Sequence, residues 1–159
     1  MKTISTLFAG ALLLIFSSCS QTKHDEGAGN NSNTEHNKMA MQKVYDAFES
    51  GNTDSLGNYV AENCVEHTPM EGTNPQGLQG LKDMIAMQRS AFPDMKCTIV
   101  SMIAEGDMVA THFNMKGTNS GAMGNMPATG KSIDINGVDI VRFENGKGVE
   151  HWGYMEEGK

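Results

Sequence analysis

The spacing of apolar residues changes near residue 93, and this change limits the chain to one fold class. Before that point apolar residues recur at i, i+3, i+4 and i+7, as they do from Met41 to Phe48, which is the spacing of an amphipathic helix. After it, apolar and polar residues alternate in four runs, 95–104, 108–118, 132–143 and 148–157. Alternation is typical of strands with one buried face. The order predicts an α+β domain, with helices packed on one face of a curved antiparallel sheet.

Three helices are expected before the sheet. The first ends at Gly51, which stands where a C-terminal cap belongs. A second, shorter helix is expected at 53–60, with Thr53 as its N-cap. The third, at 78–92, ends at the residue before Pro93, because the residue preceding a proline disfavours helical geometry.

The N-terminus has the pattern of an export signal. Lys2 precedes an almost unbroken apolar run from Leu7 to Phe16, which is too short to span a bilayer as a helix. Small residues directly before Cys19 resemble the lipobox of bacterial lipoproteins. The pattern predicts that residues 1–18 are removed and that Cys19 is lipidated, with an ordinary cleaved secretory signal as the alternative.

Residues 19–36 are predicted to be a flexible tether, because Gly, Asn and Ser are concentrated there. The two histidines of this segment are interpreted as solvated side chains without a role. The folded domain is then expected at 37–157. Lipid on Cys19 would hold the chain in the cell envelope, on the periplasmic side or the cell surface, without a spanning helix.

The charge balance excludes nucleic acid as the expected partner. Twelve Lys and Arg against 19 Asp and Glu give a formal charge of −7, which repels phosphate backbones. With three cysteines and no C-x-x-C pair, the sequence predicts neither a disulfide framework nor a metal site. Whether Cys64 and Cys97 pair stays open, although alternation places Cys97 with Ile99 and sets Cys64 opposite Val65.

Alternation also places two polar groups on apolar strand faces. In the run 132–143, Asp139 shares its face with isoleucine, valine and phenylalanine side chains. His151 has apolar neighbours in the last run, and Asn145-Gly146 is a strong hairpin signal that brings the two runs together. Asp139 and His151 are therefore a candidate acid/base pair in a cavity. The alternative is a structural carboxylate beside a satisfied core histidine.

A cavity between helices and sheet is expected, and further candidates are assigned to it. His67, in the extended stretch CVEHTP, is placed at the cavity edge on the side of Val65. His112 is expected to point outward. The residues expected to contact a ligand are aromatic or apolar members of the helices and strands: Tyr45, Tyr59, Phe92, Phe113, Ile135 and Phe143.

Three segments together resemble a known family. They are AFPDMKCTIVSMIAEGDMVATHF at 91–113, the GNMPATGK loop at 124–131, and GVDIVRFENGKGVEHW at 137–152. Their order and spacing resemble the SnoaL-like polyketide cyclase and ester cyclase group of the nuclear transport factor 2-like superfamily, over residues 37 to 157. The resemblance implies a cone of helices closed against the curved sheet, a mostly apolar small-molecule pocket, frequent dimerisation and no cofactor.

The same resemblance implies a reaction. In the cyclases a carboxylate removes a proton next to a carbonyl and a polar partner stabilises the enolate, which leads to an intramolecular aldol condensation. The family's catalytic Asp falls on Gly153 here, and a His of the pattern falls on Asp139. We therefore expect Asp139 to be the base, with His151 or His67 as proton donor or enolate stabiliser. The alternative is a non-catalytic binding protein for a small apolar ligand, because fold does not fix function.

The opposite faces of the last two runs carry an apolar patch formed by Val138, Ile140, Trp152 and Tyr154. A monomer rarely exposes so much contiguous apolar surface. The sequence predicts a homodimer that packs through its sheets, with Trp152 near the centre of the interface.

Overall fold

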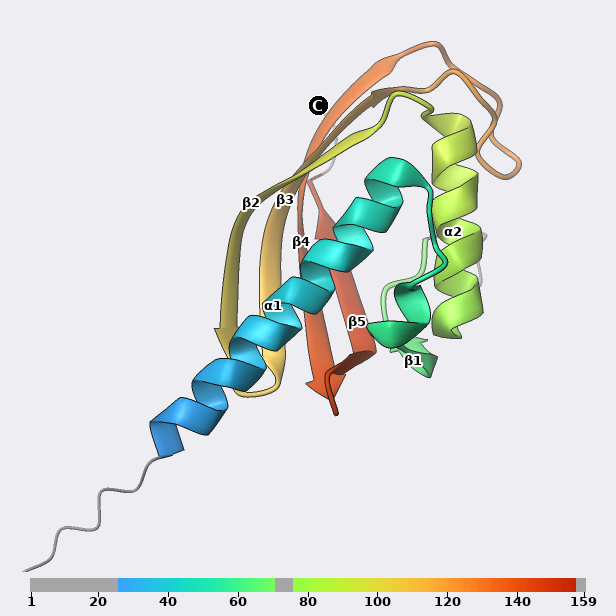
Figure 1. Cartoon of the computed structure of the whole chain (residues 1–159). Coiled ribbons are helices and arrows are strands. Elements are labelled where there is room, and N and C mark those ends of the chain that lie inside the picture. The colour runs from blue at the N-terminus through green and yellow to red at the C-terminus, as the bar shows by residue number, and fades with distance from the viewer. Residues whose placement is uncertain (1–25, 71–75, 157–159) are drawn as a thin grey trace, which may run out of the picture.

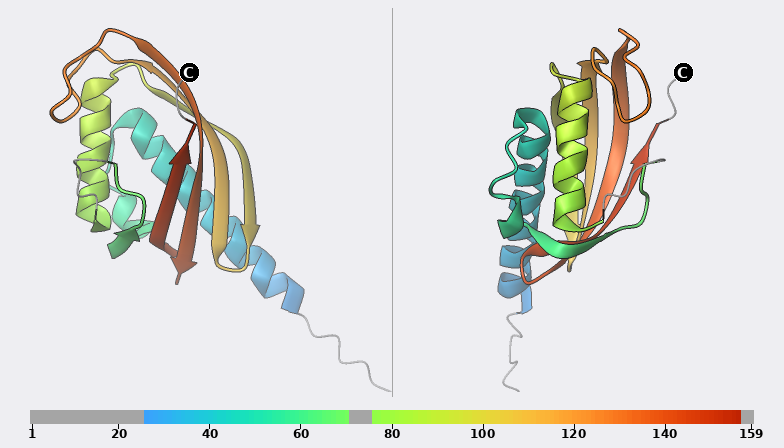
Figure 2. Two further views of the ribbon diagram at one scale, coloured as in Figure 1. Left: turned by 180° about the vertical axis from the view of Figure 1, so that it is seen from behind. Right: turned by 90° about the vertical axis from the view of Figure 1, so that its right-hand side faces the viewer.

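The computed structural model describes residues 26–70 and 76–156, with side chains from residue 33 onward. A curved five-stranded sheet forms one layer of the molecule. The helices α1 (Glu26–Ser50) and α2 (Gly77–Ala91) lie on its concave side (Figure 1, Figure 2). The arrangement confirms the predicted α+β fold.

The sheet has the strand order β1-β5-β4-β3-β2. Its strands are β1 (Val60–Glu66), β2 (Lys96–Glu105), β3 (Met108–Thr118), β4 (Ser132–Glu144) and β5 (Lys147–Met155). The four strands β2 to β5 pair antiparallel, as their alternation predicts.

The prediction of a purely antiparallel sheet is wrong at one edge. Strand β1 pairs parallel to β5, with Val60 opposite Gly148 and Glu66 opposite His151, so the sheet is mixed. A parallel partner must return through a crossover connection. Here the partner of β1 comes more than 80 residues later in the chain, and local sequence does not show which edge β1 joins.

The prediction of a second helix at 53–60 is also wrong, and residues 26–70 and 76–156 contain two α-helices rather than three. Only a single 3₁₀ turn, Leu56–Asn58, forms in that segment. The carbonyl of Tyr59 accepts a hydrogen bond from the backbone N–H of Gly148 at 2.8 Å, and Val60 already belongs to β1. Pairing with β5 therefore takes the backbone groups that a longer helix would need.

Helix α1 begins at Glu26, within the segment expected to be a tether, so the expected boundary at residue 36 falls inside a helix. Tertiary contacts stabilise the helix around residue 36. Asn37 is buried, and the His36 ring lies against Gly146 in the β4–β5 turn. Packing of this kind stabilises a helix whose own sequence has low helix propensity.

The hairpin between β4 and β5 is confirmed. Asn145 and Gly146 have φ angles of 51° and 76°, which are the positive values that a two-residue type I′ turn requires. The resulting register places Asp139 opposite Gly153 and Val141 opposite His151.

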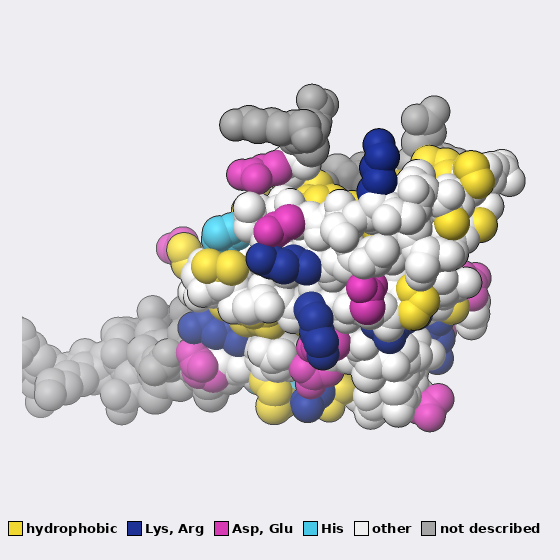
Figure 3. Space-filling model, turned by 90° about the horizontal axis from the view of Figure 1, so that it is seen from above, with side chains coloured by type: hydrophobic (Ala, Val, Ile, Leu, Met, Phe, Trp, Pro, Cys, Tyr) yellow, Lys and Arg dark blue, Asp and Glu magenta, His cyan; other side chains and the backbone are white. Residues whose placement is uncertain are grey.

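The surface carries charges of both signs. On the face seen from above, Lys and Arg side chains alternate with Asp and Glu, and no continuous basic area covers that face (Figure 3). Within residues 26–70 and 76–156, no helix combines the length and hydropathy that crossing a membrane requires.

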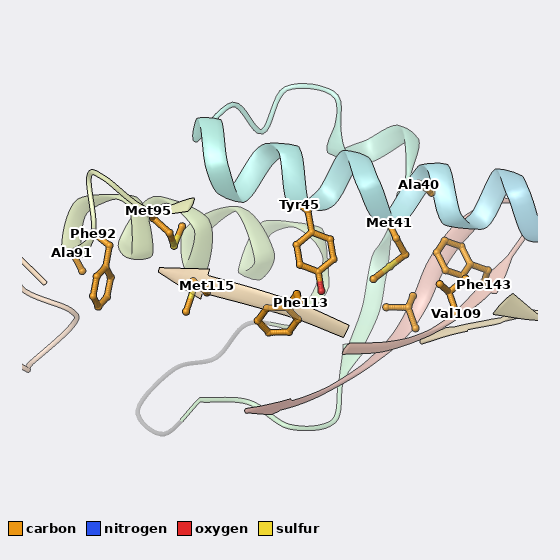
Figure 4. Packing of buried hydrophobic residues seen from close by; sticks show 11 residues of the cluster. Ala40, Met41, Tyr45, Ala91, Phe92, Met95, Val109, Phe113, Met115 and Phe143 are labelled. Atoms are coloured by element: carbon orange, nitrogen blue, oxygen red, sulfur yellow. The ribbon is translucent and has the colours of Figure 1, made fainter. Parts of the chain in front are cut away.

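The main core lies between α1 and the sheet. Met41 and Tyr45 project from α1 toward Phe113 on β3, and Val109 and Phe143 lie beside Met41 (Figure 4). The rings of Tyr45 and Phe113 meet at a centroid distance of 5.6 Å with an interplanar angle of 50°. This packing fixes the position of the Tyr45 hydroxyl over the sheet.

Candidate functional site

A cavity of about 360 Å³ lies between the two helices and the concave face of the sheet. Its size suits a small organic ligand. Most of its lining is aliphatic, aromatic or thioether, and it includes four residues that the sequence assigns to ligand contact: Tyr45, Tyr59, Phe113 and Phe143.

Tyr45 and Asp139 meet in this cavity. The Tyr45 hydroxyl donates a hydrogen bond of 2.5 Å to Oδ2 of Asp139. Burial, reinforced by the negative charge of Asp139, raises the pKa of Tyr45 far above its ordinary value. The phenol therefore stays protonated and acts as a hydrogen-bond donor to the carboxylate.

His151 lies between two carboxylates. Its Nδ1 is 2.5 Å from Oε2 of Glu66, and its Nε2 is 3.3 Å from Oδ1 of Asp139. Both ring nitrogens face acceptors, and only the imidazolium carries two N–H donors. Burial lowers the pKa of His151, but hydrogen bonds and charge attraction from Asp139 and Glu66 outweigh this and raise it to about 9. His151 is therefore protonated at neutral pH.

Glu66 is held in turn by Thr68. The backbone N–H and the hydroxyl of Thr68 donate to Oε1 of Glu66 at 2.8 and 3.1 Å. Burial acts to raise the pKa of Glu66, but the bonds from His151 and Thr68 lower it overall. The Thr68 oxygen also accepts the backbone N–H of Gly153 at 2.6 Å, which ties the end of β1 to β5. These contacts fix the orientation of His151.

The structure thus brings Asp139 and His151 together, as expected from the hairpin. It does not place every candidate in the cavity. Phe92 packs in the hydrophobic core with Met95, because it caps the end of α2 at the far side of the fold. Ile135 lies four residues before Asp139 on β4 and is not part of the cavity lining.

The placement of His67 at the cavity edge is wrong. Its side chain lies on the opposite face of the sheet, where it stacks on Trp152 with a centroid distance of 4.4 Å. Its Nε2 is 2.7 Å from Oε2 of Glu150. His112 is exposed, as expected.

Sequence reasoning missed Glu66, whose carboxylate takes the place expected for His67. Neighbouring residues of a strand point to opposite faces, so Glu66 faces the cavity with Cys64 while His67 faces outward with Val65. Val65 is 41% exposed, although a valine suggests a buried face. Cys64, two residues before Glu66 on the same strand, also lines the cavity and was the signal that could have found it.

The two thiols also line the cavity, and both are free. Cys64 lies on β1 and Cys97 on β2, which are the two edges of the sheet, so they do not pair. Burial raises the pKa of each thiol to about 11, so both are protonated and weakly nucleophilic at neutral pH. The described residues contain no group of three or more His, Cys, Asp or Glu side chains that could hold a metal ion.

Comparison with known protein families matches most of this chain to one family. The family described as SnoaL-like polyketide cyclase matches residues 38–157. The chain belongs to this family. The match covers α1 from residue 38 onward, α2, all five strands and the cavity described above.

Solved structures of similar chains agree with this membership. A candidate polyketide cyclase from Bacillus cereus is 27% identical, with a TM-score of 0.65 over 76% of this chain and 74% of that one. IdmH from Streptomyces antibioticus, also a candidate polyketide cyclase, is 27% identical, with a TM-score of 0.65 over 76% of this chain and 91% of its own.

A further SnoaL-like fold carries a different functional description. AclR from Streptomyces galilaeus, a candidate hydroxylase, is 23% identical, with a TM-score of 0.63 over 77% of this chain and 76% of its own. No functionally curated protein matches the chain. Membership of the SnoaL-like family therefore supports a role in small-molecule binding or in cyclase or isomerase chemistry, and the reaction must be argued from the site.

Proposed function

We propose that the protein is a cofactor-independent cyclase or isomerase that removes a proton next to the carbonyl of a small apolar substrate. The observation that carries the proposal is the carboxylate of Asp139, which lines the apolar cavity, accepts a hydrogen bond from Tyr45 and is ion-paired with His151. A carboxylate in such a setting is a suitable base for a carbon-bound proton.

Each polar group has a role in this reaction. The substrate C–H proton moves to Asp139, and the electron pair of the C–H bond moves onto the carbonyl oxygen as an enolate. The imidazolium of His151 supplies an N–H to the enolate oxygen. Glu66 holds the other ring nitrogen at 2.5 Å and so orients the imidazole.

Hydrogen exchange tests the reaction without knowledge of the natural substrate. The probe is 2-tetralone in D₂O, followed by proton NMR at carbon 1, which lies next to the carbonyl. The protein is expected to accelerate exchange above the buffer rate. If the compound binds in the cavity and exchange is not accelerated, proton abstraction is excluded for this class of ketone.

A second candidate function is a binding protein without catalysis. The observation that favours it is Gly153, the position on which the sequence resemblance places the family's catalytic Asp. A Cβ at residue 153 would lie 3.1 Å from Cε1 of His151 and 3.2 Å from Oδ1 of Asp139. The cluster of this chain therefore occupies space that an acid at residue 153 would need.

Gly153→Asp is accordingly expected to destabilise the fold by roughly 1–3 kcal/mol, because it crowds the cluster and adds a third carboxylate. Chemical denaturation measures the loss. Gly153→Ala is the matched variant that adds the Cβ alone, and it should lose less. A Gly153→Asp variant as stable as the wild type, with faster exchange of 2-tetralone, would contradict this account of the site.

We also propose that the protein forms a homodimer through the convex face of its sheet. Cross-strand partners align Ile103, Ala110, Ile140 and Trp152 in one row across this face. Ile103 is 72% exposed, and the neighbouring Tyr154 is 55% exposed. An apolar row of this kind favours association.

Light scattering on residues 26–159 is expected to give a dimer at micromolar concentration. Val138→Glu should weaken it at least tenfold, since a buried unpaired charge opposes association. Ala86→Glu is the control, because Ala86 is exposed on α2, on the other side of the sheet. A monomer at micromolar concentration of the wild-type chain would remove this proposal.

We further propose that the chain is anchored to the cell envelope through lipid on Cys19. Cys19 lies outside the described residues, so the proposal rests on the sequence pattern alone. Cys19→Ser is expected to move the protein from the membrane fraction to the soluble fraction, and Cys64→Ser should leave it in place. Retention of the Cys19→Ser variant in the membrane fraction would refute the anchor.

A further inference from the structure

The polar groups of the cavity belong to a single cluster with one cation. Among the described lining residues, three are Asp, Glu or His, namely Glu66, Asp139 and His151, and none is Lys or Arg. Arg142 belongs to the outer face of β4, where it pairs with two glutamates. In the described part of the chain, His151 is the one basic side chain that lines the cavity.

The cluster therefore carries an excess negative charge. His151 is a single imidazolium placed between two carboxylates, at 2.5 Å from Glu66 and 3.3 Å from Asp139. Tyr45 contributes a neutral hydroxyl to Asp139. Two carboxylates and one imidazolium leave a net charge of −1 beside a mostly apolar lining.

We propose that the cavity selects apolar ligands with a cationic amine head and excludes carboxylates, with the amine paired to the Glu66–His151–Asp139 cluster. The proposal rests on the proposed function, because it assumes that this cavity is the ligand site. An uncompensated charge in an apolar cavity is unfavourable, and a cation in the ligand compensates it. A ligand carboxylate would add like charge.

The lining suits such a cation in a second way. Five aromatic rings surround the cavity, those of Tyr45, Phe48, Tyr59, Phe113 and Phe143. Aromatic faces attract an ammonium group through cation–π interaction, and they also pack against the apolar body of a ligand. Asp139 remains 21% exposed, so its carboxylate is accessible from the cavity.

A matched series of ligands tests the charge preference. The probes share one carbon skeleton and differ only in the head group at carbon 2: 2-aminotetralin, 2-tetralol and tetralin-2-carboxylate. Isothermal titration calorimetry at pH 7 measures their dissociation constants on the wild-type protein. The amine is expected to bind at least about tenfold more tightly than the alcohol, and the carboxylate at least about tenfold more weakly.

Variants locate the preference in the cluster. Asp139→Asn and Glu66→Gln each remove one negative charge and should reduce the ratio between amine and alcohol to within about threefold. Asp134→Asn is the control, because Asp134 is an exposed carboxylate on the same strand, paired with Lys116. It should keep the full ratio. Two independent variants guard against the failure of one of them to fold.

Three results would overturn the proposal: equal binding of the three probes, tighter binding of the carboxylate, or no saturable binding of the amine at millimolar concentration. Exchange of 2-tetralone is measured separately, so the two proposals fail distinguishably. If the charge preference is observed without exchange of 2-tetralone, the proposed ligand class stands and the protein binds its ligand without catalysis. Exchange without a charge preference overturns the ligand class alone.

Discussion

Asp139→Asn is expected to slow the exchange of 2-tetralone at least about 100-fold, because the amide keeps the shape of the side chain and cannot accept the proton. Its oxygen can still accept the hydrogen bond of Tyr45, which lies 2.5 Å from the carboxylate. The fold should therefore survive. Proton NMR measures the exchange rate, and circular dichroism measures the thermal midpoint of the same sample.

The control for this variant is Asp134→Asn, which changes an exposed carboxylate on the same strand and should leave exchange unchanged. A structural role for Asp139 predicts a different pair of results. In that case Asp139→Asn would lower the thermal midpoint markedly, and the folded fraction would still bind the probe and exchange it. That outcome would end the catalytic assignment of Asp139.

The stability of the wild-type protein is expected to fall by up to about 3 kcal/mol between pH 6.5 and pH 10 because of His151. The pKa of His151 is raised to about 9 in the folded protein, since Glu66 from β1 and Asp139 from β4 outweigh the effect of burial. A raised histidine pKa contributes stability that is fully present below the unfolded value of about 6.5. This contribution is lost as pH rises through about 9.

Urea denaturation across this pH range checks the effect, with His151→Gln as the test variant. The buried thiols and Tyr45 also have raised pKa values, and their ionisation in the unfolded chain lowers stability at high pH in both proteins. The difference between the two proteins isolates His151. His112→Gln, at an exposed site on β3, should follow the wild type. Parallel pH profiles for His151→Gln and the wild type would contradict the ion-pair cluster.

The acid side of the profile has the opposite sign. The pKa of Glu66 is lowered in the folded protein because the bonds from His151 and Thr68 outweigh burial. The stability that Glu66 contributes is therefore lost as pH falls through its folded pKa. Maximum stability is expected between these two limits, near neutral pH.

Local chemistry explains which parts of the fold were predictable. The hairpin at Asn145-Gly146 follows from two residues that tolerate positive φ. Alternation on β4 and β5 placed Asp139 and His151 on one face, and hairpin pairing brought them within 3.3 Å. These features depend on neighbours in sequence, so the sequence alone was sufficient for them.

The predictions were wrong where contacts between residues far apart in the sequence determine the local structure. The segment at 53–60 does not form the expected helix, because β1 pairs with β5, a strand from the other end of the chain. Helix α1 continues through residue 36, where the His36 ring lies against Gly146 of the β4–β5 turn. Local propensity is a weak predictor in such places, because long-range backbone pairing and burial contribute more to the free energy than intrinsic preference does.

The sequence by itself determined the α+β class, the final hairpin, the family and the proximity of Asp139 and His151. Only the tertiary structure decided that Glu66 rather than His67 completes the cluster, and that Tyr45 from α1 reaches Asp139. The physical reason is that a short edge strand has no burial of its own to fix which face turns inward. That choice is made when β1 pairs with β5 and its even-numbered side chains close the cavity.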